Sequence, residues 1–262
     1  MRESRARLVM MAALLYLAWV AATYVLEGLP RTLLRPEATV LRAVYALVAN
    51  ITVGLGGSAI VLVWLTRRHP ASAAAGFGRA RRAVVGALAG ATLGGVAYWV
   101  QAPPPRPPVV LINAFAQVIT VSAAEVVVCW SVTAAVIAGA HRTLSASRAR
   151  LLALGPGAVL FGFYHVAHSP PFNSAAMIGL LTGVGIVTGV FYVVSGDIHG
   201  TVVFHNFLAL FGVLDTIERA GRSAHFTHLQ APLVVMALAT LVVMLALHGA
   251  VRRTSARPSS PD

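Results

Sequence analysis

Residues 109–140 read VVLINAFAQVITVSAAEVVVCWSVTAAVIAGA, a run of 32 residues in which Glu125 is the only charged side chain. About 20 mostly apolar residues are enough for a helix to cross a bilayer. A run this long and this apolar therefore predicts a helix in lipid rather than part of a soluble core.

Similar apolar segments make up most of the chain. They lie at 8–26, 43–66, 83–101, 151–167, 175–194, 198–214 and 231–248. Pro170 and Pro171 interrupt the series once, because proline removes a backbone donor and clashes with the preceding helical turn. Ser195-Gly196-Asp197 interrupts it again, and the proline-rich residues 102–108 predict a stiff, extended connector. The sequence predicts a single all-α membrane domain over 1–262, with about eight transmembrane helices and a short disordered tail at 252–262.

The composition excludes several classes of protein. Of the 262 residues, 58% are hydrophobic and 11% are charged, whereas a soluble domain is roughly 25% charged. The net charge of +12 comes from arginines in short clusters between apolar segments, unlike the aromatic-interleaved basic stripe of a nucleic-acid interface. There is no lysine, so chemistry through a lysine Schiff base is excluded. We therefore expect the lipid bilayer as a partner and no nucleic acid.

The arginine distribution predicts an orientation in the membrane. If the N-terminus is cytoplasmic and eight helices follow, 14 arginines fall in inner segments and 6 in outer ones. The outer arginines are Arg31, Arg35, Arg42, Arg106, Arg219 and Arg222. This bias follows the positive-inside rule and predicts a multi-pass protein of the cell membrane with both termini in the cytoplasm. A signal peptide at 8–26 is the alternative, but its 19 apolar residues exceed the usual signal core.

Glu125 is the strongest candidate for a functional residue. It is residue 17 of the 32 in segment 109–140, where a carboxylate costs roughly 2.5–3.5 kcal/mol unless it is paired, protonated or in a wet cavity. The alternative is a neutral glutamic acid that hydrogen-bonds between helices. Asp197 has a simpler explanation as the N-cap of the following helix. The remaining acids are expected in loops or tails: Glu3, Glu27, Glu37, Asp215, Glu218 and Asp262.

The nine histidines fall into two groups. Five are expected at the surface or the membrane interface: His69, His141, His225, His228 and His248. Four gather within 160–206: His165, His168, His199 and His205. A glutamate in mid-membrane with histidines on two other helices suits water activation, either by a general base with a proton shuttle or by zinc. His165 and His205 are the candidate zinc ligands.

Two neighbouring features complete the pattern. His165 and His168 are three residues apart, so they share a helix face. The single cysteine, Cys129, lies inside the longest apolar segment and is expected to be a small buried hydrophobe.

The order of these residues resembles that of the CPBP intramembrane proteases, also called the Abi or CAAX prenyl protease family. That family carries Glu-Glu-x-x-x-Arg, then Phe-x-x-x-His, then a histidine followed four positions later by an asparagine or a similar residue. Here Glu125 is followed by Phe161-Gly-Phe-Tyr-His165 and then by His205-Asn206. The approach to His205 through residues 195–198 is also similar. The resemblance covers about residues 115–215, and eight helices agree with the family's fold.

The resemblance implies hydrolysis of a peptide bond within the membrane, in a hydrophobic or prenylated peptide or protein. Glu125 and His165 would activate the water, directly or through a metal such as zinc. His205, helped by Asn206, would donate to the developing oxyanion, a role that supplies roughly 3–4 kcal/mol per donor.

Two further residues would support this site. His168 would hold His165 in one tautomer, and Phe161 would pack one helical turn below His165.

The first motif is degenerate, and this keeps other functions open. Ala124 stands where the family has the first of two glutamates, Cys129 replaces the arginine, and Ala209 lies four residues after His205. One alternative is a catalytically inactive family member that acts as a membrane immunity or assembly factor. Its function would depend on close helix packing at small residues such as Gly179, Gly183 and Gly185. A second alternative is a haem-binding membrane protein, because paired histidines ligate haem.

Overall fold

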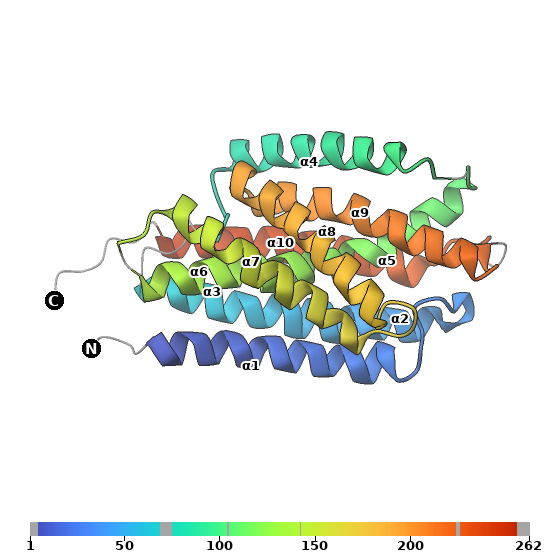
Figure 1. Ribbon diagram of the computed structural model, residues 1–262, viewed down its shortest axis with the longest axis horizontal. Coiled ribbons are helices and arrows are strands. Elements are labelled where there is room, and N and C mark those ends of the chain that lie inside the picture. The colour runs from blue at the N-terminus through green and yellow to red at the C-terminus, as the bar shows by residue number, and fades with distance from the viewer. Residues whose placement is uncertain (1–4, 69–74, 104, 142, 224–225, 256–262) are drawn as a thin grey trace.

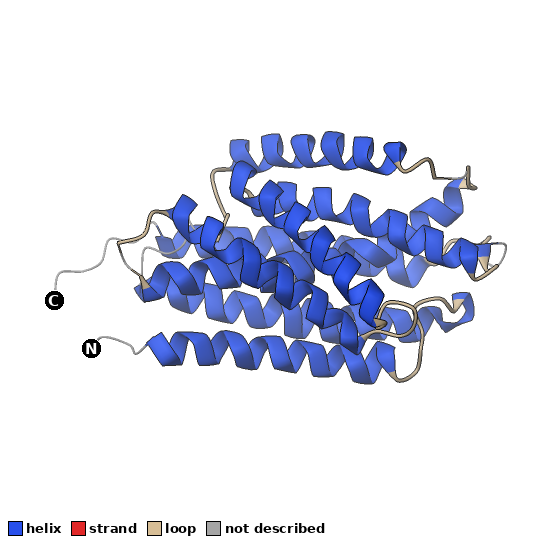
Figure 2. Ribbon diagram, in the orientation of Figure 1, coloured by secondary structure: helices blue, strands red, loops and turns tan. Residues whose placement is uncertain are grey.

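The computed structural model describes residues 5–68, 75–103, 105–141, 143–223 and 226–255. Within these residues every regular element is a helix and none is a strand (Figure 2). Eight helices are long and apolar enough to cross a membrane: Arg5–Gly28, Thr39–Arg68, Ala80–Val100, Pro108–Ala140, Ala146–Ala167, Ala175–Ser195, Ile198–Arg219 and Ala231–Ser255. The predicted all-α membrane architecture is confirmed, because each of the eight predicted segments lies within or overlaps one of these helices.

The spans consist of shorter elements that meet end to end. These elements are α1 (Arg5–Thr23), η1 (Tyr24–Gly28), η2 (Pro36–Ala38), α2 (Thr39–Tyr45), η3 (Ala46–Gly56), α3 (Gly57–Arg68), α4 (Ala80–Val100), α5 (Pro108–Val126), η5 (Val127–Val132), α6 (Thr133–Ala140), α7 (Ala146–Tyr164), η6 (His165–Ala167), α8 (Ala175–Ser195), α9 (Ile198–Arg219) and α10 (Ala231–Ser255). The start of α1 and the end of α10 lie at the same end of the bundle (Figure 1).

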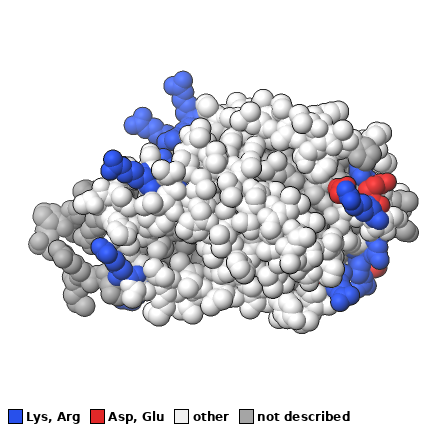
Figure 3. Space-filling model, in the orientation of Figure 1, with Lys and Arg blue, Asp and Glu red and all other residues white. Residues whose placement is uncertain are grey.

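The surface shows the division expected of a membrane protein. Charged side chains gather at the two ends of the molecule, and a broad band between them carries none on the face shown in Figure 3. Large apolar side chains such as Leu88, Trp99 and Val194 are exposed. Exposure of this kind is stable where lipid rather than water surrounds the helices.

Two helices extend further than predicted. α9 runs to Arg219, five residues beyond the predicted end at 214, so Asp215 and Glu218 lie on the helix rather than in a loop. α10 runs to Ser255, so residues 252–255 are helical rather than part of a disordered tail. Residues 256–262 lie outside the described residues. In both cases the predicted end was placed where charged residues interrupt the apolar pattern. The helices continue beyond that point, past the hydrocarbon region.

The turn between α8 and α9 matches its prediction. Gly196 has φ +57° and ends α8 in the left-handed conformation that glycine adopts without a Cβ clash. Asp197 then begins α9, and its Oδ1 accepts a hydrogen bond of 2.8 Å from the backbone N–H of Gly200. The predicted N-cap is thus confirmed, and it fixes the start of the helix that carries His205.

Close packing at glycine places α9 against α4. Gly90 faces the backbone of α9, and a Cβ at this position would collide with the carbonyl oxygen of Gly200. Small residues at membrane helix interfaces allow this approach of two backbones.

The glycines of α8 behave differently from one another. A Cβ on Gly185 would lie 3.0 Å from the Cα of Ala158, so this glycine packs against α7. Gly179 and Gly183 have open space around the position of a Cβ. The expectation of close packing therefore holds at Gly185 and is wrong at the other two.

Candidate functional site

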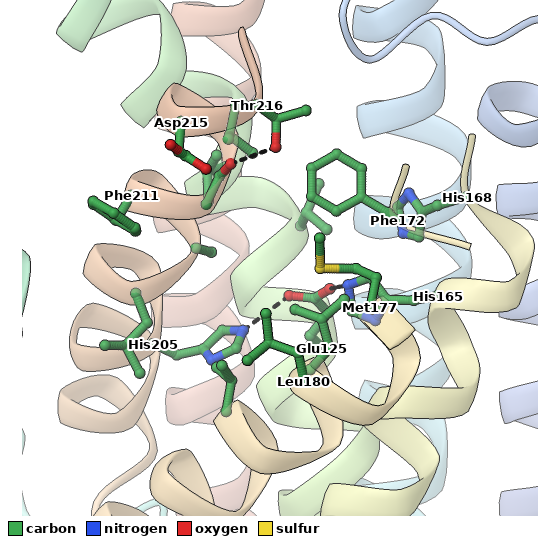
Figure 4. Close-up of a pocket in the computed structure, with 18 of the residues that line it drawn as sticks. Glu125, His165, His168, Phe172, Met177, Leu180, His205, Phe211, Asp215 and Thr216 are labelled. Carbon is green, nitrogen blue, oxygen red and sulfur yellow. Dashed lines mark hydrogen bonds and ion pairs between the residues drawn. The ribbon is translucent and has the colours of Figure 1, made fainter. Parts of the chain in front are cut away.

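The carboxylate of Glu125 lies between two histidines from other helices. Glu125 is 3% exposed near the end of α5, in the most buried of the eight spans. Its Oε2 is 3.0 Å from His205 Nε2 on α9, and its Oε1 is 3.7 Å from His165 Nε2 at the end of α7 (Figure 4). The three side chains predicted to act together therefore converge, and they do so within the bundle.

His205 is held at both ring nitrogens. Its Nδ1 lies 2.9 Å from the hydroxyl of Thr188 on α8, and its Nε2 faces Glu125. When the carboxylate is ionised it only accepts hydrogen bonds, so Nε2 is the donor in that contact. The Thr188 hydroxyl fixes the ring through Nδ1. His205 thus presents its Nε2–H to the carboxylate of Glu125.

The orientation of His165 is set by its own helix. Its Nδ1 lies 2.8 Å from the carbonyl oxygen of Phe161, one turn earlier. A carbonyl oxygen is only an acceptor, so Nδ1 donates to it, and when the ring is neutral its Nε2 lone pair faces Glu125. The prediction that His168 sets this tautomer is wrong, because the Phe161 carbonyl does so. The Phe161 ring packs edge-on against His165 and His205, at 4.8 and 4.9 Å between ring centroids.

His168 nevertheless belongs to the same cluster. Its ring stacks on that of His165 with centroids 5.1 Å apart, although His168 lies just past the end of the helix. Its Nδ1 is 3.0 Å from Oε2 of Glu27 and faces that carboxylate, whereas its buried Nε2 has no hydrogen-bond partner among the described residues. His168 is therefore a buried imidazole with capacity to bind a further group.

Glu27 is a site residue that sequence reasoning missed. It was expected in a loop, but it lies in the last turn of the first span and is fully buried. Ser169 holds its carboxylate with a backbone N–H at 2.9 Å and a hydroxyl at 2.5 Å. A second buried carboxylate thus stands behind His168, as Glu125 stands beside His165.

The position of Glu27 depends on a local change of helix type. Residues Tyr24–Gly28 form a π-helical turn, and a further π-helical segment, Val127–Val132, begins two residues after Glu125. Such turns are common at functional sites because they rotate side chains out of the ordinary helical register. Apolar periodicity does not reveal them, which is one reason why the sequence did not identify Glu27.

A cavity of about 260 Å³ connects these groups with one end of the bundle. Glu125, His165, His168 and His205 line its inner part. Its walls are mostly apolar and come from α5, α8 and α9. Its far part is lined by Asp215 and Thr216 near the end of α9 (Figure 4), and Leu33 and Gln101 also line the cavity. The carboxylate in mid-membrane thus faces a cavity, the setting in which a buried charge is tolerated.

Two predicted neighbours lie elsewhere. Asn206 is fully buried but does not line the cavity, and its side-chain atoms have no hydrogen-bond partner among the described residues. Adjacent residues on a helix point about 100° apart, which separates Asn206 from His205. His199 pairs instead with His248, at 2.8 Å between Nε2 and Nδ1. His248 is therefore in contact with another helix rather than simply at the surface.

Four other histidines were expected at the surface or the membrane interface. His141 and His228 are exposed as predicted, and His69 and His225 lie outside the described residues.

The degenerate motif positions are packed into the core. Ala124 is fully buried, and its Cβ lies 2.9 Å from the position that a Cβ on Gly54 would occupy. Cys129 is also fully buried and has no cysteine partner, as expected of a small hydrophobe. Neither residue lines the cavity. A longer side chain at Ala124 would therefore displace η3 rather than enter the site.

The cluster could hold a metal ion. The ligand atoms of Glu125, His165 and His168 all lie within 4.8 Å of one another, and all three residues are buried. A carboxylate and two imidazoles are ligands that zinc and several other divalent metals accept. The sequence had proposed His165 with His205, whereas the described group contains His168 in place of His205.

Comparison with protein-family models, with curated proteins and with solved structures finds no match to this chain. The residues of the site therefore carry the functional argument.

Proposed function

We propose that the protein is an intramembrane endopeptidase of the CAAX-protease type, which hydrolyses a peptide bond with water activated by Glu125 and His165. The observation that carries the proposal is the placement of one buried carboxylate between two histidines, at 3.0 and 3.7 Å, on the wall of a cavity. A carboxylate and imidazoles within reach of one small volume are what general acid–base hydrolysis needs.

Each histidine is oriented for a different role. When His165 is neutral, its Nε2 lone pair lies 3.7 Å from the Glu125 carboxylate, so a water molecule in contact with both groups can give its proton to either. His205 donates its Nε2–H to Glu125 and is held at Nδ1 by Thr188. Once Glu125 has taken the proton of the water, the same N–H suits donation to the oxyanion that forms on the substrate carbonyl. Asn206 takes no part, since its side chain does not line the cavity.

A divalent metal fits the same residues. Glu125, His165 and His168 would hold it, and the buried Nε2 of His168, which lacks a hydrogen-bond partner among the described residues, supports this assignment. A bound zinc ion supplies a water of lowered pKa. Glu27 and Ser169 would keep His168 in position through the contact at its Nδ1.

The cavity favours a hydrophobic substrate. Its walls include Met177, Leu180, Leu181, Val184 and Phe211, all apolar. An extended apolar segment or a prenylated chain end would replace lipid against these side chains and bring a peptide bond to the inner end of the cavity.

The orientation of the chain is also a proposal. The arginine bias supports both termini in the cytoplasm, and the shared end of α1 and α10 agrees with an even number of crossings. Reporter fusions at Arg68 and Arg106 should then give signals from opposite sides of the membrane. Signals from the same side would reject this topology.

The proposed activity is tested with purified protein in lipid nanodiscs and a library of peptides that contain apolar segments. In water enriched in ¹⁸O, hydrolysis places the heavy isotope in each newly formed carboxylate, which mass spectrometry detects. We expect labelled products with the native chain and with Glu37→Gln, which makes the same chemical change at an exposed site. Labelled products at the same level with Glu125→Gln would contradict the proposal.

A further inference from the structure

A second hollow lies at the surface, at one end of the bundle. It has a volume of about 390 Å³, and three arginines line it: Arg31, Arg35 and Arg222. The other lining residues are Pro30, Leu34, Ser169, Pro170 and Ala220. We call this hollow the arginine cleft.

The arginine cleft forms where three spans end. Residues 30–35 follow the first span, residues 169–170 follow the fifth, and residues 220–222 follow α9. Ends of transmembrane helices lie at the level of the lipid headgroups. The cleft is therefore placed at the membrane interface whichever way the protein is oriented.

The charges in the cleft are incompletely balanced. Glu37 pairs with Arg35, with 2.7 Å between Oε1 and Nε. This hydrogen bond, together with the charge of Arg222, lowers the pKa of Glu37. Arg222 donates to the carbonyl oxygen of Leu34, and neither Arg31 nor Arg222 forms an ion pair with a described residue. Arg31 and Arg222 thus carry two positive charges that have no ion pair among the described residues.

The other predicted outer arginines are engaged elsewhere. Arg106 pairs with Glu218 at 2.6 Å, and Arg219 pairs with Asp215 at 2.7 Å. Arg42 is buried and donates to two glutamine side chains. This contrast separates the cleft from a general scatter of interfacial arginines.

The backbone conformation of Arg31 is also unusual. Arg31 has φ +53°, in the left-handed region that non-glycine residues rarely adopt. Its N–H donates to the carbonyl oxygen of Glu27, so the conformation is fixed by the turn that ends the first span. The chain thus carries an arginine at a position where glycine would adopt the backbone conformation without strain.

We propose that the arginine cleft binds the phosphate group of an anionic phospholipid. Guanidinium groups from separate segments match the oxygens of a phosphate, and their arrangement at the interface matches the depth of a headgroup. The proposal does not depend on the protease activity. The cleft is nevertheless connected to the catalytic cluster, because Ser169 lines the cleft and donates its backbone N–H to the Glu27 carboxylate.

The test measures binding of phosphatidylglycerol and phosphatidylcholine to the purified chain by native mass spectrometry. The variant Arg31→Gln with Arg222→Gln removes the charges of these two arginines. Its control, Arg5→Gln with Arg253→Gln, removes two charges from exposed positions on α1 and α10. A third variant, Arg31→Lys with Arg222→Lys, keeps both positive charges. It separates the effect of lost charge from the effect of replacing these two side chains.

We expect the native chain to prefer phosphatidylglycerol and the cleft variant to bind it at least tenfold more weakly, at about fivefold per arginine. The control should stay within twofold, and the lysine variant should bind more tightly than the glutamine variant. Equal loss in the control, or no preference for the anionic lipid, would overturn the proposal. Inorganic phosphate that binds with the same arginine dependence and displaces the lipid would assign the cleft to a soluble phosphate instead.

Discussion

Glu125 Oε2 and His205 Nε2 lie 3.0 Å apart although 80 residues separate them in the chain. The contact joins the most buried span to α9 and gives the carboxylate a donor inside the bundle. A carboxylate left alone at this depth would cost several kcal/mol. The pairing explains how the chain tolerates Glu125 and why removal of either partner affects the other.

Glu27→Gln should lower the rate of peptide hydrolysis by roughly 10–100-fold, the usual effect of losing a residue that orients a catalytic histidine. Glutamine keeps the volume but offers no carboxylate to His168, which lies 3.0 Å from Glu27. Cleavage assays on purified protein measure the effect. Glu27→Gln activity equal to that of the exposed-site control Glu37→Gln would show that Glu27 has only a structural role.

Metal binding should depend on His168 and not on His205. The described ligand group contains Glu125, His165 and His168, all within 4.8 Å, whereas His205 engages Thr188 with its second nitrogen. Zinc titration by calorimetry should show at least tenfold weaker binding in His168→Ala and a change below about threefold in His205→Ala. The reverse order would place the metal between His165 and His205 instead.

Ala124→Glu should destabilise the protein and leave activity no higher. The change would place a carboxylate against η3, where the Cβ of Ala124 already faces Gly54. Overpacking costs about 1–3 kcal/mol, and a buried charge adds to this cost. Thermal unfolding in detergent and the cleavage assay measure the two effects. Increased cleavage would mean that position 124 reaches the cavity after all.

Gly185→Leu and Gly179→Leu form a matched pair on α8. A side chain at Gly185 meets the backbone of Ala158, whereas Gly179 has open space around it. We expect Gly185→Leu to lower the free energy of unfolding by about 1–3 kcal/mol and Gly179→Leu to leave it nearly unchanged. Equal effects on the melting temperature would contradict the packing of α8 against α7.

The sequence was sufficient for the spans because hydropathy and length are local properties. Glu125 could be found in the same way, since a lone charge in the middle of 32 apolar positions is conspicuous. Glu27 could not be found in this way. An acid at the end of a span is normally exposed, where its charge costs little free energy, so its position in the sequence does not indicate burial. Its burial follows from Ser169, 142 residues away in the chain.

The other differences also have physical causes. Asn206 follows His205 in sequence, but the helix turns its side chain away from the cavity. His199 lies near His205 in sequence, yet it is in the first turn of α9, nearly two turns before His205, and it contacts His248 on α10. Neighbourhood along the chain is therefore a poor guide to neighbourhood in a helical bundle, where a side chain's direction changes with every residue.

We propose that Glu125 activates the water, and the variant Glu125→Gln is the sharpest test of this role. Glu125→Gln keeps the volume of the side chain and a hydrogen-bond acceptor for His205, but it cannot take a proton from water. The rate of peptide hydrolysis by purified, folded Glu125→Gln protein is measured beside that of the native chain. We expect Glu125→Gln to lose hydrolysis while its membrane insertion and melting temperature stay nearly unchanged. Full hydrolysis by Glu125→Gln would contradict the catalytic role of Glu125.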